Sequence, residues 1–146
     1  MGFGAGLVPK APGTAGTLVA IPLAWLLALV LPTAYVALLA IPLFAVGVWA
    51  CGVTGRALGD EDCGSMVWDE IVAFLPLAVL CLAKPLWLLG AFLLFRLFDI
   101  AKPFPIRQVE RRVKGGFGVM IDDVLAAIYA FLAFTLALFV AALIAP

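Results

Sequence analysis

The sequence predicts an all-α fold: a small multi-pass bundle of membrane helices, some of them short or re-entrant. Hydrophobic residues make up 66% of the chain and the mean hydropathy is +1.24, whereas soluble proteins are only about half apolar. Charged residues make up 12%, against about a quarter in soluble proteins. The length of 146 residues suits one compact domain, which we expect to cover residues 1–146.

Apolar and polar segments alternate along the chain. A full membrane span needs about 20 residues at about 1.5 Å each, and only Val124–Ala145 reaches this length comfortably. The shorter apolar segments form two pairs with nearly uncharged connectors: Leu18–Leu31 with Ala34–Ala50, and Ile71–Ala83 with Leu86–Phe95. A hairpin returns to the side where it began, whether it crosses the membrane or dips into it. One membrane face is therefore predicted to carry all three polar segments: Met1–Thr17, Gly52–Glu70 and Arg96–Asp123.

The basic residues predict which face this is. The shared face holds nearly all of them: Arg56, Lys102, Arg107, Arg111, Arg112 and Lys114, with Lys10 and Arg96 at its edges. The opposite face has only Lys84. The positive-inside rule places the shared face in the cytoplasm, and the C-terminus outside if the last helix spans. The net charge of zero gives no sign of a nucleic-acid partner.

All nine acidic residues lie on the shared face, several of them at the ends of apolar segments. Asp69-Glu70 and Asp122-Asp123 precede such segments, and Asp99 follows one. One acidic pair could simply anchor a helix end among lipid headgroups. Three carboxylate groups at one depth repel each other unless cations compensate them. Oxygen ligands in this number favour Mg²⁺, which keeps waters for a phosphate substrate.

Elements that suit phosphate accompany the carboxylates. Residues Ala11–Thr17 form a Pro- and Gly-shaped turn before an apolar helix, with Thr14 as a plausible N-cap and free backbone N–H groups that attract an anion. A flexible capped helix start is the plainer explanation of this segment. Arg96 and Asp99 are three residues apart and share one helix face. Pro103 should end that helix at Lys102. Gly115–Gly118 is expected to be a pliable loop that can approach a ligand closely.

Several other chemistries are excluded. The chain has no histidine, which removes the commonest general base and zinc ligand. Cys51 and Arg56 are one residue too close for a Cys-x5-Arg phosphate loop, and no Asp-x-Asp nucleophile motif occurs. The three widely spaced cysteines predict free thiols. Two functions of other classes compete with a phosphatase: a small transporter or channel subunit with a carboxylate-lined cation site, and a structural membrane protein.

Four blocks of the sequence resemble the phosphatidylglycerophosphatase A family. They are Gly2–Gly6 with Pro9 and Ala11–Thr17, Gly64–Glu70, Phe95–Asp99 with Lys102–Ile106, and Gly115–Asp123. The resemblance covers nearly the whole chain. Ala73 and Ala127 stand where the family usually has glycine. The resemblance implies a Mg²⁺-dependent enzyme of the bacterial inner membrane that converts phosphatidylglycerol phosphate, a lipid, to phosphatidylglycerol and phosphate at the cytoplasmic face.

Roles can then be assigned to individual residues. We expect Asp69, Glu70, Asp99 and Asp123 to bind metal or its activated water, with Asp122 in a supporting catalytic role and Asp62 as a further metal ligand. Arg96 and Lys102 should bind the phosphate together with the turn from Thr14 to Thr17, because a phosphate dianion needs fixed positive charge. Glu110, Arg111 and Arg112 are expected to be a solvated or headgroup-facing run. Attack by water and attack by an aspartate both remain open as mechanisms.

Overall fold

The computed structural model describes residues 2–59 and 63–144, and all of the regular structure in these ranges is helical. The prediction of an all-α fold is confirmed. A short 3-10 helix precedes six α-helices: η1 (Gly2–Leu7), α1 (Pro12–Ala28), α2 (Thr33–Leu58), α3 (Trp68–Cys81), α4 (Pro85–Ala101), α5 (Ile106–Arg112) and α6 (Gly115–Ile144). Cys51, Cys63 and Cys81 are free thiols, as expected.

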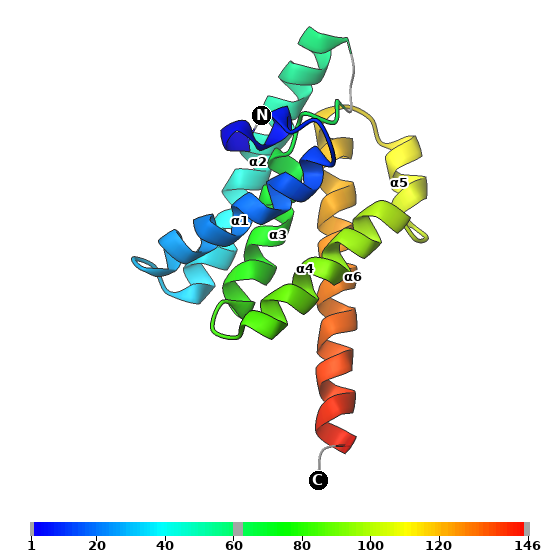
Figure 1. Ribbon diagram of the computed structural model, residues 1–146. Coiled ribbons are helices and arrows are strands. Elements are labelled where there is room, and N and C mark those ends of the chain that lie inside the picture. Colours follow the sequence, from blue (N-terminus) through cyan, green and yellow to red (C-terminus); the bar gives the residue numbers. More distant parts are fainter. Residues whose placement is uncertain (1, 60–62, 145–146) are drawn as a thin grey trace.

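Helix α3 is the centre of the bundle and packs against α1, α2, α4 and α6 (Figure 1). It is apolar on nearly every side, and Phe74 and Leu75 are completely buried. The ring of Phe74 packs against that of Phe95 in α4, with 5.3 Å between centroids. A helix that is hydrophobic all round belongs in an interior. The short segment predicted as Ile71–Ala83 is thus a core helix that holds its polar first turn in place.

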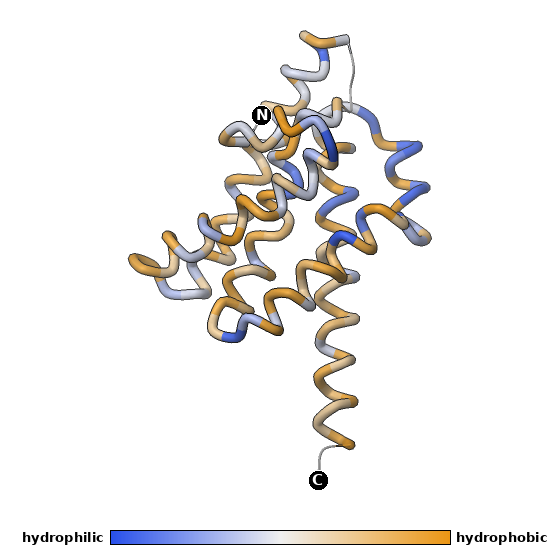
Figure 2. Tube along the Cα trace, in the orientation of Figure 1, coloured by the Kyte–Doolittle hydropathy of each residue, from blue (hydrophilic) through white to orange (hydrophobic). Residues whose placement is uncertain are grey.

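Both predicted hairpins are present. Helix α1 turns into α2 just before Thr33, and α3 turns into α4 at Lys84, with Pro85 in the first turn of α4. Proline suits a helix start because its missing N–H would have no partner there. Both connectors lie on the side of the molecule away from the start of α6 (Figure 1). The strongly polar residues gather toward the other end, apart from the α3–α4 connector (Figure 2).

Helices α2 and α6 are long and apolar enough to cross a membrane. The expectation that only Val124–Ala145 reaches spanning length is wrong, because α2 continues beyond its apolar stretch to Leu58. It ends where Gly59 adopts a left-handed conformation (φ 68°) and donates its N–H to the carbonyl of Gly55. Glycine takes this conformation without a steric penalty. The polar segment after Ala50 is therefore partly helical.

The predicted loop Gly115–Gly118 is also wrong, since these residues are the first turn of α6. A Cβ on Gly116 would collide with the carbonyl oxygen of Val48 and the backbone of Gly52. The glycine thus allows α6 to cross α2 at backbone contact. It fixes where α6 sits, and with it the position of the acidic pair one to two turns later.

Candidate active site

Three carboxylates from two helices form a compact cluster, named here the carboxylate cluster: Asp69 and Glu70 in the first turn of α3, and Asp123 in α6. One oxygen of each lies within 4.8 Å of the others. Asp69 and Asp123 are buried, with 6% and 4% of their surface exposed. No lysine or arginine in residues 2–59 and 63–144 forms an ion pair with any of the three. Buried like charges at this spacing strongly disfavour each other unless a cation joins them.

The carboxylate cluster fits a hard divalent cation. Its donors are all carboxylate oxygens, the ligands that Mg²⁺ prefers. One oxygen of Glu70, Oε2, is buried and has no hydrogen-bond partner, which leaves it available as a ligand. Asp69 Oδ1 accepts the backbone N–H of Glu70 at 3.1 Å, so the first turn of α3 is locally ordered. The residues that the sequence predicted as metal ligands include all three.

An arginine lies beside the carboxylate cluster. Arg96 Nη1 in α4 is 2.6 Å from Asp99 Oδ2, as the spacing of these residues predicted. The same nitrogen donates to Thr17 Oγ1 in α1 at 3.4 Å, while Arg96 Nε is buried without a hydrogen-bond partner. The carboxylate of Asp99 interacts electrostatically with those of Glu70 and Asp123. Arg96 therefore keeps a donor for an anion at the edge of the cluster.

The start of α1 touches the same place. A Cβ on Gly13 would collide with Glu70 Oε1 and lie 3.2 Å from Arg96 Nη1, so the glycine lets the first turn of α1 approach both side chains. Thr17 donates its hydroxyl to the carbonyl oxygen of Gly13 at 2.9 Å. Thr14 is not the N-cap that the sequence predicted, because α1 begins at Pro12 and Ala11 holds the cap position. A proline at the start of a helix moves the boundary ahead of the threonine.

A second polar group, named here the lysine bridge, lies next to the carboxylate cluster. Lys102 Nζ is 2.7 Å from Asp122 Oδ2 and 2.7 Å from Glu110 Oε1. The lysine follows the last residue of α4, where Pro103 ends the helix as predicted. Burial alone would lower the pKa of Lys102, but its hydrogen bonds to the two carboxylates outweigh this and raise the pKa above the ordinary lysine value. Lys102 thus remains charged.

The structure brings most of the predicted residues together. Asp69, Glu70, Asp99, Asp123, Arg96 and Thr17 surround one place, and Lys102 with Asp122 lies beside it. Asp62 lies outside the described residues. Arg111 and Arg112 are exposed as expected, and Glu110 is partly exposed but also binds Lys102, a contact that the sequence did not predict. Sequence reasoning placed Gly13 in the predicted phosphate-binding turn but missed its close approach to Glu70 and Arg96, which only the packing of α1 against α3 and α4 shows.

Comparison with known proteins identifies the family. The sequence model of the phosphatidylglycerophosphatase A family matches residues 1–138. The chain belongs to this family. It is 47% identical over 135 residues to phosphatidylglycerophosphatase A of Haemophilus influenzae, covering 89% of this chain and 80% of the relative. It is 41% identical over 132 residues to phosphatidylglycerophosphatase A of Escherichia coli, covering 88% and 74% respectively.

The name of a third relative gives a different substrate. The chain is 45% identical over 145 residues to a putative phosphatidylinositol-3-phosphatase of Bacteroides thetaiotaomicron, covering 90% of this chain and 86% of the relative. No solved structure is significantly similar to the chain. Membership of the family makes the protein a membrane-associated phosphatase. It does not favour the transporter or channel subunit that the sequence left open.

Proposed function

We propose that this protein hydrolyses the terminal phosphate monoester of phosphatidylglycerophosphate to give phosphatidylglycerol and phosphate, in a Mg²⁺-dependent reaction. The names of two relatives support the substrate. The carboxylate cluster beside Arg96 is the observation that carries the chemistry. A metal-dependent phosphomonoester hydrolase holds the phosphate dianion with bound cations and with fixed hydrogen-bond donors. This end of the bundle has carboxylates that can bind the cations and an arginine that can donate to the phosphate.

Each residue then has a task. Asp69, Glu70 and Asp123 would hold Mg²⁺, and Asp99 would hold Arg96 in place through their 2.6 Å contact. Arg96 would donate to the phosphate oxygens from its unpaired Nε. The free N–H groups in the first turn of α1 would orient the same anion, because the N-terminus of a helix attracts negative charge. When bound, Mg²⁺ supplies positive charge to the phosphate and activates a water molecule.

Two chemical routes fit this arrangement. In one, a carboxylate of the cluster accepts a proton from the attacking water while the P–O bond to phosphatidylglycerol breaks, and the leaving oxygen takes up a proton. In the other, an aspartate attacks phosphorus while the P–O bond to phosphatidylglycerol breaks and its oxygen takes up a proton, and water then hydrolyses the aspartyl-phosphate to release phosphate. Acid quenching with ³²P-labelled substrate distinguishes them, since only the second route leaves label on the protein.

The metal requirement is tested with the purified full-length chain in detergent and phosphatidylglycerophosphate as substrate. We expect phosphate release to stop in excess chelator and to return with Mg²⁺ or Mn²⁺, because oxygen ligands prefer hard cations. Full activity in excess chelator would overturn the metal site. The absence of phosphate release with every divalent cation would overturn the substrate assignment.

We also place the polar end of the bundle in the cytoplasm, on a chain that crosses the inner membrane several times. Helices α2 and α6 are long enough to span, and the lysines and arginines concentrate at one end. Single cysteines, introduced into a chain with the three native ones replaced, report the orientation. A reagent that cannot cross the membrane should reach a cysteine at Thr33 and miss those at Ser65 and Gln108. Labelling of Ser65 from outside intact cells would reverse this topology.

A further inference from the structure

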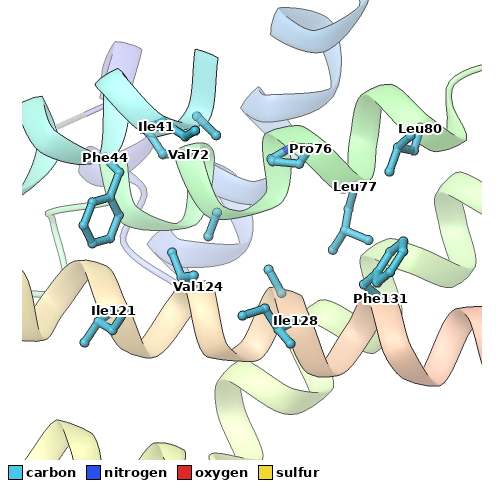
Figure 3. Close-up of a pocket in the computed structure, with 13 residues that line it drawn as sticks. Ile41, Phe44, Val72, Pro76, Leu77, Leu80, Ile121, Val124, Ile128 and Phe131 are labelled. Atoms are coloured by element: carbon cyan, nitrogen blue, oxygen red, sulfur yellow. The ribbon is translucent and has the colours of Figure 1, made fainter. Parts of the chain in front are cut away.

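An apolar groove lies between α2, α3 and α6, on the side of α3 that α1 and α4 leave open. Its volume is about 470 Å³, within the range of about 300–1,000 Å³ that small-molecule pockets occupy. Every lining residue is apolar, including Phe44 from α2, Val72 and Leu77 from α3, and Ile128 from α6. Figure 3 shows side chains of α3 and α6 facing each other across it, for example Leu77 and Phe131.

One end of the groove lies near the carboxylate cluster. On α3 its wall is formed by Val72, Ala73, Pro76, Leu77 and Leu80. Residues three and four apart share a helix face, so Asp69 lies on the same face one turn before Val72 and Ala73. On α6, Ala127 lines the groove one turn after Asp123. The α6 wall runs from Ile121 to Phe131, so Asp123 lies near the end of this wall that is closer to the start of α6.

We propose that this groove binds an acyl chain of the phospholipid substrate while the phosphate lies at the carboxylate cluster. The proposal rests on the proposed function, because it assigns the tail of the same substrate. An amphiphile with its charge at one end matches an apolar groove whose walls belong to α3 and α6, the two helices that carry the carboxylate cluster. The groove also lies between α2 and α6, the two helices long enough to cross a membrane, so it opens at the depth of the acyl chains.

Two alanines keep the groove open. Ala73 in α3 and Ala127 in α6 both line it, and a larger side chain at either position would project into the space that the acyl chain fills. The variants Ala73→Leu and Ala127→Leu should therefore obstruct the tail while they leave every cluster carboxylate in the sequence. Ala137→Leu is the matched control, because Ala137 is exposed on the same helix and does not line the groove.

The first experiment compares long-chain phosphatidylglycerophosphate with its short-chain, water-soluble counterpart. In Ala73→Leu and Ala127→Leu we expect the ratio of kcat/KM for long to short chains to fall at least about tenfold, the scale of a few displaced methylene groups in an apolar pocket. Ala137→Leu should leave the ratio at the wild-type value. An unchanged ratio in both groove variants overturns the proposal. Wild-type protein that hydrolyses neither substrate would refute the proposed function instead.

The second experiment detects the tail directly and does not depend on turnover. Phosphatidylglycerophosphate with a diazirine in one acyl chain is cross-linked to the full-length protein, and labelled peptides are mapped. We expect label on α3 and α6 groove residues, loss of label in Ala127→Leu, and competition by unlabelled phosphatidylglycerophosphate but not by phosphatidylcholine. Equal competition by both lipids would mean that bulk lipid fills the groove. Ready disulfide dimers of an Ile128→Cys variant would mean that a second copy of the chain fills it. Either result overturns the proposal.

Discussion

Asp122 and Asp123 are neighbours in α6, yet their carboxylates lie in different electrostatic surroundings. Asp122 Oδ2 is 2.7 Å from Lys102 Nζ, and Glu110 completes the lysine bridge. Asp123 faces Asp69, Asp99 and Glu70 instead, and no lysine or arginine in the described ranges pairs with it. Both side chains are almost fully buried, so burial does not distinguish them. The difference lies in whether the protein itself supplies the opposing charge.

Under the proposed function, we expect the lysine bridge to stabilise the fold and the carboxylate cluster to carry the chemistry. The lysine bridge joins the loop after α4 to α5 and α6, which is what a paired charge does in a stable protein. The carboxylate cluster has Arg96 at its edge, but Arg96 is paired with Asp99. Three further buried carboxylates are costly to keep ionised together, and a bound divalent cation would offset that cost. Arrangements that weaken the folded state locally are common at active sites.

Separate substitutions of Asp122 and Asp123 should give the largest difference in activity. Asp123→Asn keeps size but removes the ligand charge, and we expect kcat to fall at least about a hundredfold, the scale of losing a key electrostatic group. Asp122→Asn leaves Lys102 paired with Glu110 and should cost much less activity. Phosphate release by purified variants measures both. Equal losses in two folded variants would show that the lysine bridge and the carboxylate cluster act as one site.

Substitution of Asp99 tests whether this carboxylate binds the metal or only positions Arg96. If Asp99 acts at the metal, Asp99→Asn should lower kcat at least about a hundredfold. If Asp99 only positions Arg96, the loss should match that of Arg96→Lys, and the pH profile of kcat should keep its shape. The two variants together therefore distinguish a direct role from a positioning role.

Arg96→Lys is expected to have the next largest effect. Lysine keeps the charge but loses the fork that reaches Asp99, Thr17 and an anion together. The loss of one hydrogen bond to a charged partner is worth about 1.5–3 kcal/mol, which corresponds to roughly tenfold or more in kcat/KM. Arg112→Ala is the control, since Arg112 is exposed and should be nearly neutral. A dead Arg112→Ala beside an active Arg96→Lys would contradict the site.

Gly13→Ala also affects the carboxylate cluster, and we expect a smaller loss of activity. The new Cβ would press on Glu70 Oε1, the end of a flexible side chain, so Glu70 should move while the fold survives. We expect a cost of about 1 kcal/mol in transition-state stabilisation, roughly fivefold in kcat. Gly64→Ala is the matched control, because a Cβ there has nothing within 4 Å. Equal losses in both variants would exclude contact with Glu70 as the cause.

The sequence predicted those parts of the site that depend on local spacing. Arg96 and Asp99 are three residues apart in a helix, so their contact follows from helical geometry. The sequence could not separate Asp122 from Asp123, because adjacent residues point about 100° apart and only the packing of α6 decides which one faces α3. Gly115–Gly118 was predicted as a loop because glycine disfavours helices. The close crossing with Val48 and Gly52 outweighs that preference.

Substitution of Lys102 in the lysine bridge should have the smallest effect on activity. Lys102→Met keeps the length of the side chain but leaves Asp122 and Glu110 without their shared partner, and we expect the melting temperature to fall by a few degrees, about 2–4 °C for each kcal/mol lost. Because the pKa of Lys102 is raised in the folded protein, its contribution is complete below the ordinary value of 10.5 and is lost only as the pH rises beyond it. The difference in melting temperature between wild type and variant should therefore stay constant from about pH 7 to about pH 9, which is below the ordinary lysine pKa of 10.5. If Lys102 also binds phosphate, as the sequence suggested, the variant should raise KM as strongly as Arg96→Lys does. A lower melting temperature with a nearly unchanged KM would assign Lys102 to the fold alone.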